Sequence, residues 1–218
     1  MEERGAHYAM LGDLADGLEL PLAFIRSLQM VKQERQLGRP LTDDDRKILW
    51  AAEQGLRLIS SVRLVLEAEM LLPEPVAVRG VIEEVSADFG QFWRLVGERP
   101  AQKIPREQLL VDVNRQALKC FLATLLAESL RFERSGQLFV TKAGGLVRVG
   151  VRDFGPALPR NFAINAAQTL PLRPKSRQAF LVISELVRAM HSKLGQTSHR
   201  DGVSFFVELP VSRQASLL

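Results

Sequence analysis

Apolar residues recur at steps of three and four over the N-terminal third of the chain, a spacing typical of amphipathic helices. The first repeat ends near Gly38-Arg39-Pro40. Its members are Leu11, Leu14, Leu18, Leu22, Ile25 and Leu28. The second repeat follows Thr42, which offers an N-cap ahead of three aspartates in the first turn. Its members are Leu49, Ala52, Leu56, Ile59, Val62, Leu66 and Met70, and Pro73 and Pro75 end it. The pattern therefore predicts a helical hairpin over residues 1–72.

A hairpin of this length cannot bury its own apolar stripe, so the stripe needs a second surface to cover it. Each helix would span about 30 residues, or about 45 Å at 1.5 Å per residue. The simplest solution is that two chains pair their hairpins into a four-helix bundle, which predicts a homodimer. The alternative is that the hairpin packs on the rest of its own chain.

Beyond Pro75 the pattern changes, and short strands alternate with helices. Residues 76–82 are typical of a strand or of a strand leading into a helix, and residues 82–96 of a helix. The elements expected after them are a strand at 108–113, a helix at 114–132, a β-hairpin at 137–142 and 146–151, a helix at 178–193, and a β-hairpin at 194–197 and 203–209. This order predicts a second domain over residues 76–212, in which helices cover a mixed sheet in an α+β fold.

Composition and charge exclude several classes of protein. Of the 218 residues, 46% are hydrophobic and 25% are charged, the balance of a globular protein. The net charge of +4 is too small to favour a dedicated nucleic-acid binder. The single cysteine, Cys120, stands in an apolar run and is expected to be a buried thiol. With no apolar run of about 20 residues, we expect a cytoplasmic protein with no membrane sensor of its own.

One carboxylate stands out because a short apolar strand leads directly to it. Asp153 follows the apolar run and precedes a Gly155-Pro156 turn. An acid in that position can accept hydrogen bonds from a ligand, and a glycine next to it lets the ligand approach the backbone. The alternative is that Asp153 only caps backbone N–H groups of its own turn.

In this order of elements the chain resembles the cytoplasmic core of a sensor histidine kinase, in which a dimerisation and phosphotransfer hairpin precedes a Bergerat-type ATP-binding sandwich. It is also similar to histidine-phosphotransferase proteins of the same architecture. The matching segments lie at 11–17, 21–22, 112–118, 184–190 and 202–210, together with the Asp153 turn. The resemblance covers residues 10–210 and implies an α+β fold with an α/β sandwich of the histidine-kinase ATPase type.

The phosphoacceptor histidine of that family has no counterpart here. The family places it about five residues before a proline that matches Pro21, and this position is Asp16, unless one helical turn is missing. Neither alignment leaves an imidazole to attack the γ-phosphorus. His7 lies elsewhere on the first helix and is expected to be a surface residue, while His191 and His199 belong to the second domain. We therefore expect no catalytic residue.

The resemblance also implies a vestigial nucleotide pocket. Its residues would be Asp153 and Gly155, which match the family's adenine-binding turn, with Glu128 in place of the magnesium-binding asparagine and Arg131 in the basic position that follows. A carboxylate can bind Mg²⁺, so Glu128 alone would not abolish nucleotide binding.

The replacement of the family's phosphate-binding glycines should impair nucleotide binding more than the change at Glu128. Those of the second glycine box fall on Lys175, Arg177 and Ala179, and the last glycine of the Asp153 turn falls on Ala157. Side chains at these positions should obstruct the approach of a triphosphate to the backbone. We expect neither ATP nor a metal ion as a cofactor.

These observations favour a catalytically inactive histidine-kinase-like signalling protein that acts by binding. The partner implied by the resemblance is a response-regulator receiver domain or a histidine kinase. Its docking face would lie on the first helix around Asp16, Phe24, Arg26 and Gln29.

Three alternatives stay open. The first is a divergent kinase or ATPase that keeps ATP through Asp153, Glu128, Arg131 and a basic loop at 160–177. The second is a phosphotransfer relay, for which only His7 lies on the hairpin. Nucleic-acid binding is the third, and it rests on the charge of +4 alone.

Overall fold

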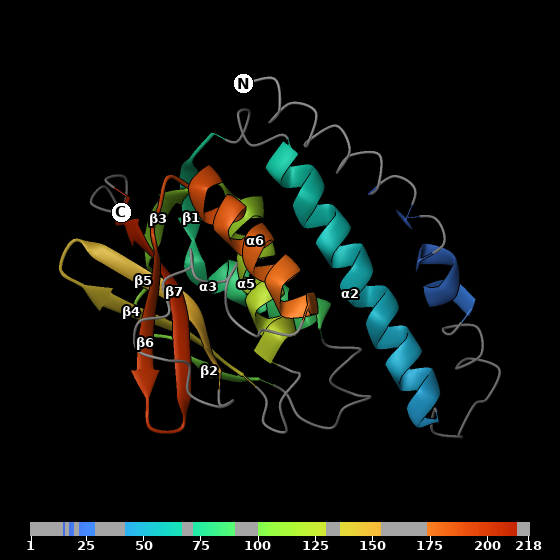
Figure 1. The fold of residues 1–218 in the computed structure, drawn as a ribbon. Helices are drawn as coiled ribbons and strands as arrows, with labels where there is room; N and C mark the ends of the chain where they lie inside the picture. Colours follow the sequence, from blue (N-terminus) through green and yellow to red (C-terminus); the bar gives the residue numbers. More distant parts are fainter. Residues whose placement is uncertain are drawn as a thin grey trace.

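The computed structural model describes residues 15, 18–19, 22–28, 42–66, 72–89, 100–129, 136–153 and 174–212. Helical residues at 15, 18–19 and 22–28, called the first helix below, are followed by α2 (Asp43–Leu66), β1 (Glu74–Ala77), α3 (Val78–Asp88), β2 (Ala101–Lys103), β3 (Leu110–Val113), α5 (Arg115–Ser129), β4 (Gln137–Ala143), β5 (Leu146–Asp153), α6 (Pro174–Ala189), β6 (Leu194–His199) and β7 (Gly202–Pro210). The sheet, the layer of α5 and α6, helix α2 and the first helix follow one another across the molecule (Figure 1). The predicted α+β fold, with a helical hairpin ahead of a sheet-and-helix sandwich, is confirmed.

The main sheet has five strands in the order β2-β4-β5-β7-β6. Both predicted β-hairpins, β4–β5 and β6–β7, are present and antiparallel, and β5 pairs with β7 in the centre. Strand β2, which the sequence did not predict, pairs parallel to β4 at one edge. A second, two-stranded sheet joins β1 to β3.

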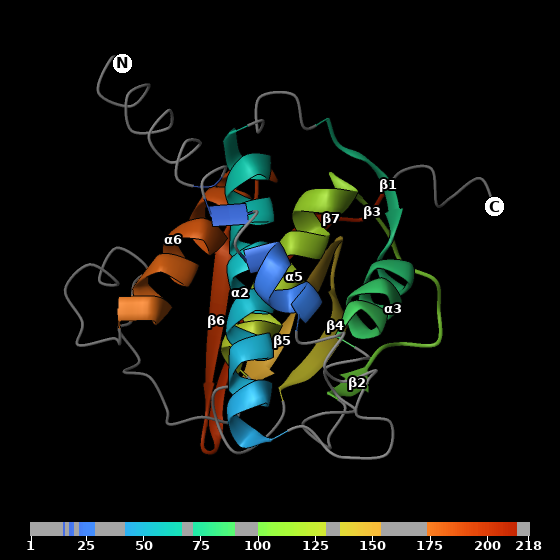
Figure 2. The same cartoon turned by 90° about the vertical axis from the view of Figure 1, so that its right-hand side faces the viewer.

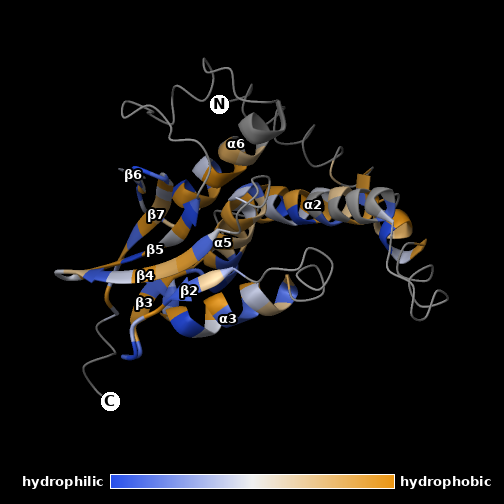
Figure 3. Ribbon diagram, turned by 90° about the horizontal axis from the view of Figure 1, so that it is seen from below, coloured by the Kyte–Doolittle hydropathy of each residue, from blue (hydrophilic) through white to orange (hydrophobic). Residues whose placement is uncertain are grey.

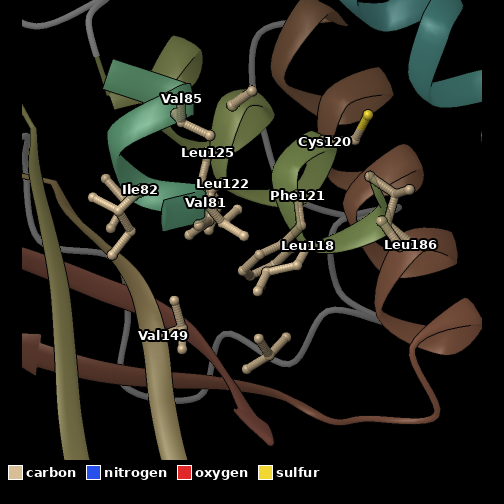
Figure 4. Packing of buried hydrophobic residues seen from close by; sticks show 14 of the residues in the cluster. Val81, Ile82, Val85, Leu118, Cys120, Phe121, Leu122, Leu125, Val149 and Leu186 are labelled. Carbon is tan, nitrogen blue, oxygen red and sulfur yellow. The ribbon is translucent and has the colours of Figure 1, made fainter. Parts of the chain in front are cut away.

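Strand alternation places one face of the sheet against the helices. Val147, Val149 and Val151 of β5 are buried beside Phe205 and Val207 of β7. Helix α5 covers this face with Leu118, Phe121, Leu122 and Leu125, and α3 adds Val81, Ile82 and Val85 (Figure 4). Hydrophobic residues gather where α5 meets the sheet (Figure 3). One contiguous apolar core therefore joins the sheet to its helices.

The opposite face of the sheet carries polar and charged residues in the same registers. Arg148 of β5 forms an ion pair with Glu208 of β7 at 2.9 Å, and Arg152 pairs with Asp201 at 2.7 Å. Between them, Gly150 lies so close to β7 that a Cβ atom there would be 2.0 Å from the Phe205 carbonyl oxygen. The β5–β7 pairing thus requires glycine at this position.

The first helix and α2 form the predicted hairpin. Glu19 pairs with Arg63 at 2.5 Å and Arg26 with Glu53 at 2.8 Å, so residue numbers rise along one helix as they fall along the other. Leu22 packs against Gly55, where a Cβ atom would lie 2.5 Å from Leu22 Cδ1. The two helices are therefore antiparallel and in close contact.

Helix α2 also packs on the rest of its own chain. This is the alternative that the sequence left open beside pairing with a second chain. It contacts α5 and α6 on the side away from the first helix (Figures 1 and 2). This contact leaves the homodimer as a prediction, because it uses only one side of the hairpin. The boundary between residues 1–72 and 76–212 also stays a prediction.

Asn114 connects the entry of the sandwich to α5. Its Oδ1 accepts a hydrogen bond from the Ala117 backbone N–H at 2.9 Å, so it caps the N-terminus of α5. Its Nδ2 donates to the carbonyl oxygen of Leu72, just before β1. Asn114 thereby connects Leu72, where the chain enters the sandwich, to the start of α5.

Some element bounds differ from those expected. The helix expected at 82–96 begins at Val78 and is described to Asp88, while α6 begins at Pro174, four residues earlier than the pattern indicated. Met70 and the end of the second repeat lie outside the described residues. Among the residues that are described, no helix is long and apolar enough to cross a membrane.

Candidate functional site

Asp153 is the last residue of β5, where the central strand ends. It lies opposite Val203 of β7 and is half-buried. Because side chains alternate along a strand, Asp153 shares the face of Val149 and Val151, which is the face that the helices cover. Its carboxylate therefore belongs to the layer between sheet and helices, where the resemblance places a nucleotide.

Glu128 lies in the last turn of α5, at the same end of this layer. It is half-buried. The neighbouring Ser129 and the strand residue Val151 converge at Gly136, where a Cβ atom would lie 2.2 Å from Ser129 Oγ and 3.1 Å from Val151 Cγ1. The structure thus brings the ends of α5 and β5 together, and with them the segments that carry Glu128 and Asp153. Gly155 and Arg131, the other two residues of the expected pocket, lie outside the described residues.

The stretch that matches the second glycine box is helical. Lys175, Arg177 and Ala179 all lie within α6. Ala179 is buried, and the Phe180 ring meets the Phe205 ring edge-on with centroids 5.3 Å apart. Past the first turn of a helix, backbone N–H groups bond to carbonyls four residues back. The backbone of Ala179 is therefore hydrogen-bonded within the helix, and its side chain is buried.

The candidate docking residues of the hairpin are only partly described. Phe24 is 64% exposed, and Arg26 reaches across to Glu53 of α2. Asp16 and Gln29 lie outside the described residues, as does His7. Phe24 and Arg26 belong to one helical stretch, residues 22–28, whose outer side also exposes apolar residues.

Metal-binding groups do not gather in the described part of the chain. No group of three or more His, Cys, Asp or Glu residues lies close enough together there to hold an ion. His199 instead shares a hydrogen bond of 2.8 Å with the Ser204 hydroxyl between β6 and β7.

Sequence reasoning missed one site, which lies where α2 meets the sandwich. Arg57 of α2 stacks on the ring of Phe89, with the guanidinium carbon 3.9 Å from the ring centroid. The available signal was its position: Arg57 is adjacent to Leu56 but off the apolar repeat, on the side of the helix that also carries Ser61 and Leu64.

A glycine substitution at position 179 tests whether the segment that matches the second glycine box is helical. Ala179→Gly should lower the free energy of unfolding by about 1 kcal/mol, because glycine is disfavoured in a helix interior. His191→Gly is the matched control at the other end of the element. His191 has a φ of 50° after α6, a conformation that glycine adopts freely, so this variant should be neutral or more stable. Urea denaturation followed by circular dichroism measures both, and an unchanged stability of Ala179→Gly would contradict the helical assignment.

Comparison with known proteins identifies the fold. No family model and no curated protein matches the sequence. Among solved structures, the catalytic domain of the histidine kinase ThkA is similar, with 20% identity and a TM-score of 0.53 over 64% of this chain and 97% of that one. The Acinetobacter baumannii histidine kinase AdeS matches with 14% identity and a TM-score of 0.57 over 88% and 96% of the two chains. ThkA in complex with the response regulator protein TrrA matches with 19% identity and a TM-score of 0.55 over 97% of this chain and 65% of that one. The chain thus has the fold of a histidine-kinase core, as its sequence predicted.

Proposed function

We propose that this chain is a catalytically inactive, histidine-kinase-like signalling protein that dimerises through its hairpin and binds a receiver domain. The observation that carries the proposal is the apolar surface on the outer side of the hairpin. Leu18, Phe24 and Leu28 of the first helix are 51%, 64% and 52% exposed, and Ile48 of α2 is 43% exposed. Clustered apolar residues on a surface mark a binding site more often than scattered ones do.

A second copy of the chain is the partner that fits the larger part of this surface. Leu18, Ile25 and Leu28 follow the helical repeat and lie beside the positions that contact α2. The inner side of α2 is already covered by α5 and α6, so the outer side of the hairpin is the one left for another subunit. An isologous dimer would pair two such hairpins in a four-helix bundle.

Two features support the absence of catalysis. The expected phosphoacceptor position is occupied by Asp16 or deleted, and a carboxylate does not supply the nitrogen nucleophile of a histidine kinase. The stretch that would need glycines to cradle a triphosphate is part of α6. Binding, rather than phosphoryl transfer, is then the activity that a hairpin joined to a sandwich of this fold can serve.

A receiver domain is the second partner we propose. The solved complex of ThkA contains a response regulator protein, which supports this class of partner for a chain of the same fold. The exposed Phe24 offers an aromatic anchor for such a partner.

Placing a charge in the proposed dimer interface should separate the subunits. Ile25→Asp should weaken self-association at least tenfold, because the carboxylate would be buried once in each subunit. Ser27→Asp adds the same charge to an exposed position of the same helix, away from the apolar stripe, and should leave the dimer intact. Sedimentation velocity over a concentration series measures both. Equal masses for the Ile25→Asp variant and the unchanged protein would refute this interface.

Nucleotide should neither bind tightly nor be consumed. Incubation with labelled ATP and Mg²⁺ should leave the protein unlabelled, and millimolar ATP should not move the melting temperature. The alternative of a divergent kinase or ATPase makes the opposite prediction. Ligand at 100 times Kd would add about 2.7 kcal/mol of stability, and Asp153→Ala would abolish that gain. Stoichiometric autophosphorylation would overturn the proposal.

Removal of the aromatic anchor should weaken receiver binding without affecting the dimer. We expect Phe24→Ala to raise the Kd for a cognate receiver domain at least tenfold, the scale of about 1.4 kcal/mol for an interface residue. Titration calorimetry against individually purified receiver domains measures this. His7→Ala distinguishes the relay alternative, since only a relay would lose phosphoryl transfer from a phosphorylated receiver. An unaltered Kd for Phe24→Ala would place the docking face elsewhere.

A further inference from the structure

The main sheet ends on one side with a strand whose outer edge is open. Within the described part of the chain, β6 pairs with β7 alone, and the strands follow one another from β6 to β2 across the molecule (Figure 3). In an antiparallel pair, alternate residues direct both N–H and C=O away from the neighbouring strand. Half of the six residues of β6 therefore offer donors and acceptors to an added strand.

The outer edges of β1 and β2 carry features that hinder the addition of a strand, and β6 carries none of them. Strand β2 has only three residues and ends in the exposed Lys103, while β1 contains Pro75, which has no backbone N–H. Strand β6 has six residues, among them no proline, lysine, arginine or acidic residue, and it pairs with β7 without a bulge. An edge of this kind is a template for an extended segment.

Contacts on the outer face of the sheet hold β6 in the extended form that an added strand requires. The Phe206 ring of β7 covers Gly195 so closely that a Cβ atom there would lie 2.4 Å from Phe206 Cε2. At the other end of the strand, His199 Nε2 and the Ser204 hydroxyl share a hydrogen bond of 2.8 Å. The edge is thus formed before a partner arrives, which lowers the entropic cost of binding.

Cations flank the open edge at both ends. Lys193 precedes β6 and Arg200 follows it, and both side chains are exposed. Neither forms an ion pair with another residue that the structure describes. The two acids of the β6–β7 hairpin, Asp201 and Glu208, are already paired with arginines of β5. The edge therefore presents positive charge that no neighbouring carboxylate of the hairpin balances.

We propose that the outer edge of β6 binds an extended, acidic segment of a partner protein, which adds as a further strand and places a carboxylate near each of the two cations. Lys193 and Arg200 lie about 23 Å apart along the strand at about 3.3 Å per residue, so the carboxylates should stand about seven residues apart. A second copy of this chain fits the edge poorly, because an antiparallel pair centred on β6 would bring Lys193 opposite Arg200. The inference does not depend on dimerisation through the helical hairpin or on receiver binding.

A synthetic peptide of about eight residues tests the edge directly. Its sequence alternates valine and threonine between an aspartate at each end, and a fluorescent label reports binding by polarisation. We expect saturable binding with a Kd below about 1 mM. Backbone amide exchange within β6 should slow at least tenfold in the complex, because the added strand protects the outward N–H groups, while exchange in β2 should not change. The same peptide with its central backbone nitrogens methylated keeps the charge but cannot donate, so it should bind at least tenfold more weakly.

Charge reversal at both ends of β6 should weaken binding of this peptide. Lys193→Glu combined with Arg200→Glu should raise the Kd at least tenfold, because two attractions become repulsions. Lys103→Glu combined with Arg106→Glu is the matched control: it makes the same change of charge at exposed positions on and beside β2, and it should leave the Kd unchanged.

Three results would overturn the proposal. The first is the absence of saturable binding, and the second is equal affinity for the unmodified and the methylated peptide or an unaltered Kd in the Lys193 and Arg200 double variant. The third is slower amide exchange of β6 at higher protein concentration without peptide, which would identify a second copy of the chain as the occupant of the edge.

Discussion

The burial of α5 on nearly its whole circumference is the constraint on which the rest of the structure depends. Eleven of its residues are buried, including the neighbours Leu125, Leu126 and Ala127, which point in different directions. A helix that is apolar all round must be covered on every side. The sheet, α3, α6 and α2 each cover one side of it. The layer order of the molecule follows from this requirement, and so does the close packing of the hairpin on the sandwich.

Periodicity in the sequence was enough to predict the elements whose two faces differ. The β4–β5 and β6–β7 hairpins alternate between the core and the outer face, so their strands were predicted within a few residues. The hairpin helices likewise followed from their apolar steps. Strand β2 was missed because all three of its residues are exposed, which leaves no apolar pattern to detect. The start of α6 was predicted four residues too late, because the first residues of this helix are polar and show no apolar repeat.

Site residues were harder to predict because their roles depend on contacts between distant segments. Asp153 was found from its local context, a carboxylate directly after a buried strand. Its proximity to the end of α5 follows only from the meeting of Ser129, Gly136 and Val151 in space. For Arg57 the sequence offered only its place on the side of α2 that carries Ser61 and Leu64, and an arginine on an amphipathic helix is ordinarily exposed. Only the packing of α2 against the sandwich shows that its guanidinium stacks on the buried ring of Phe89.

The short connection between the hairpin and the sandwich has a consequence for how each contact responds to dilution. The described part of α2 ends at Leu66, only eight positions before β1 begins at Glu74, and Asn114 holds Leu72 at the start of α5. A tether this short gives two linked surfaces an effective concentration on the order of millimolar. The contact between α2 and the sandwich is therefore intramolecular and independent of protein concentration. Contacts with any second molecule weaken as the protein is diluted, so the association of the two parts of one chain should outlast its assembly with other chains.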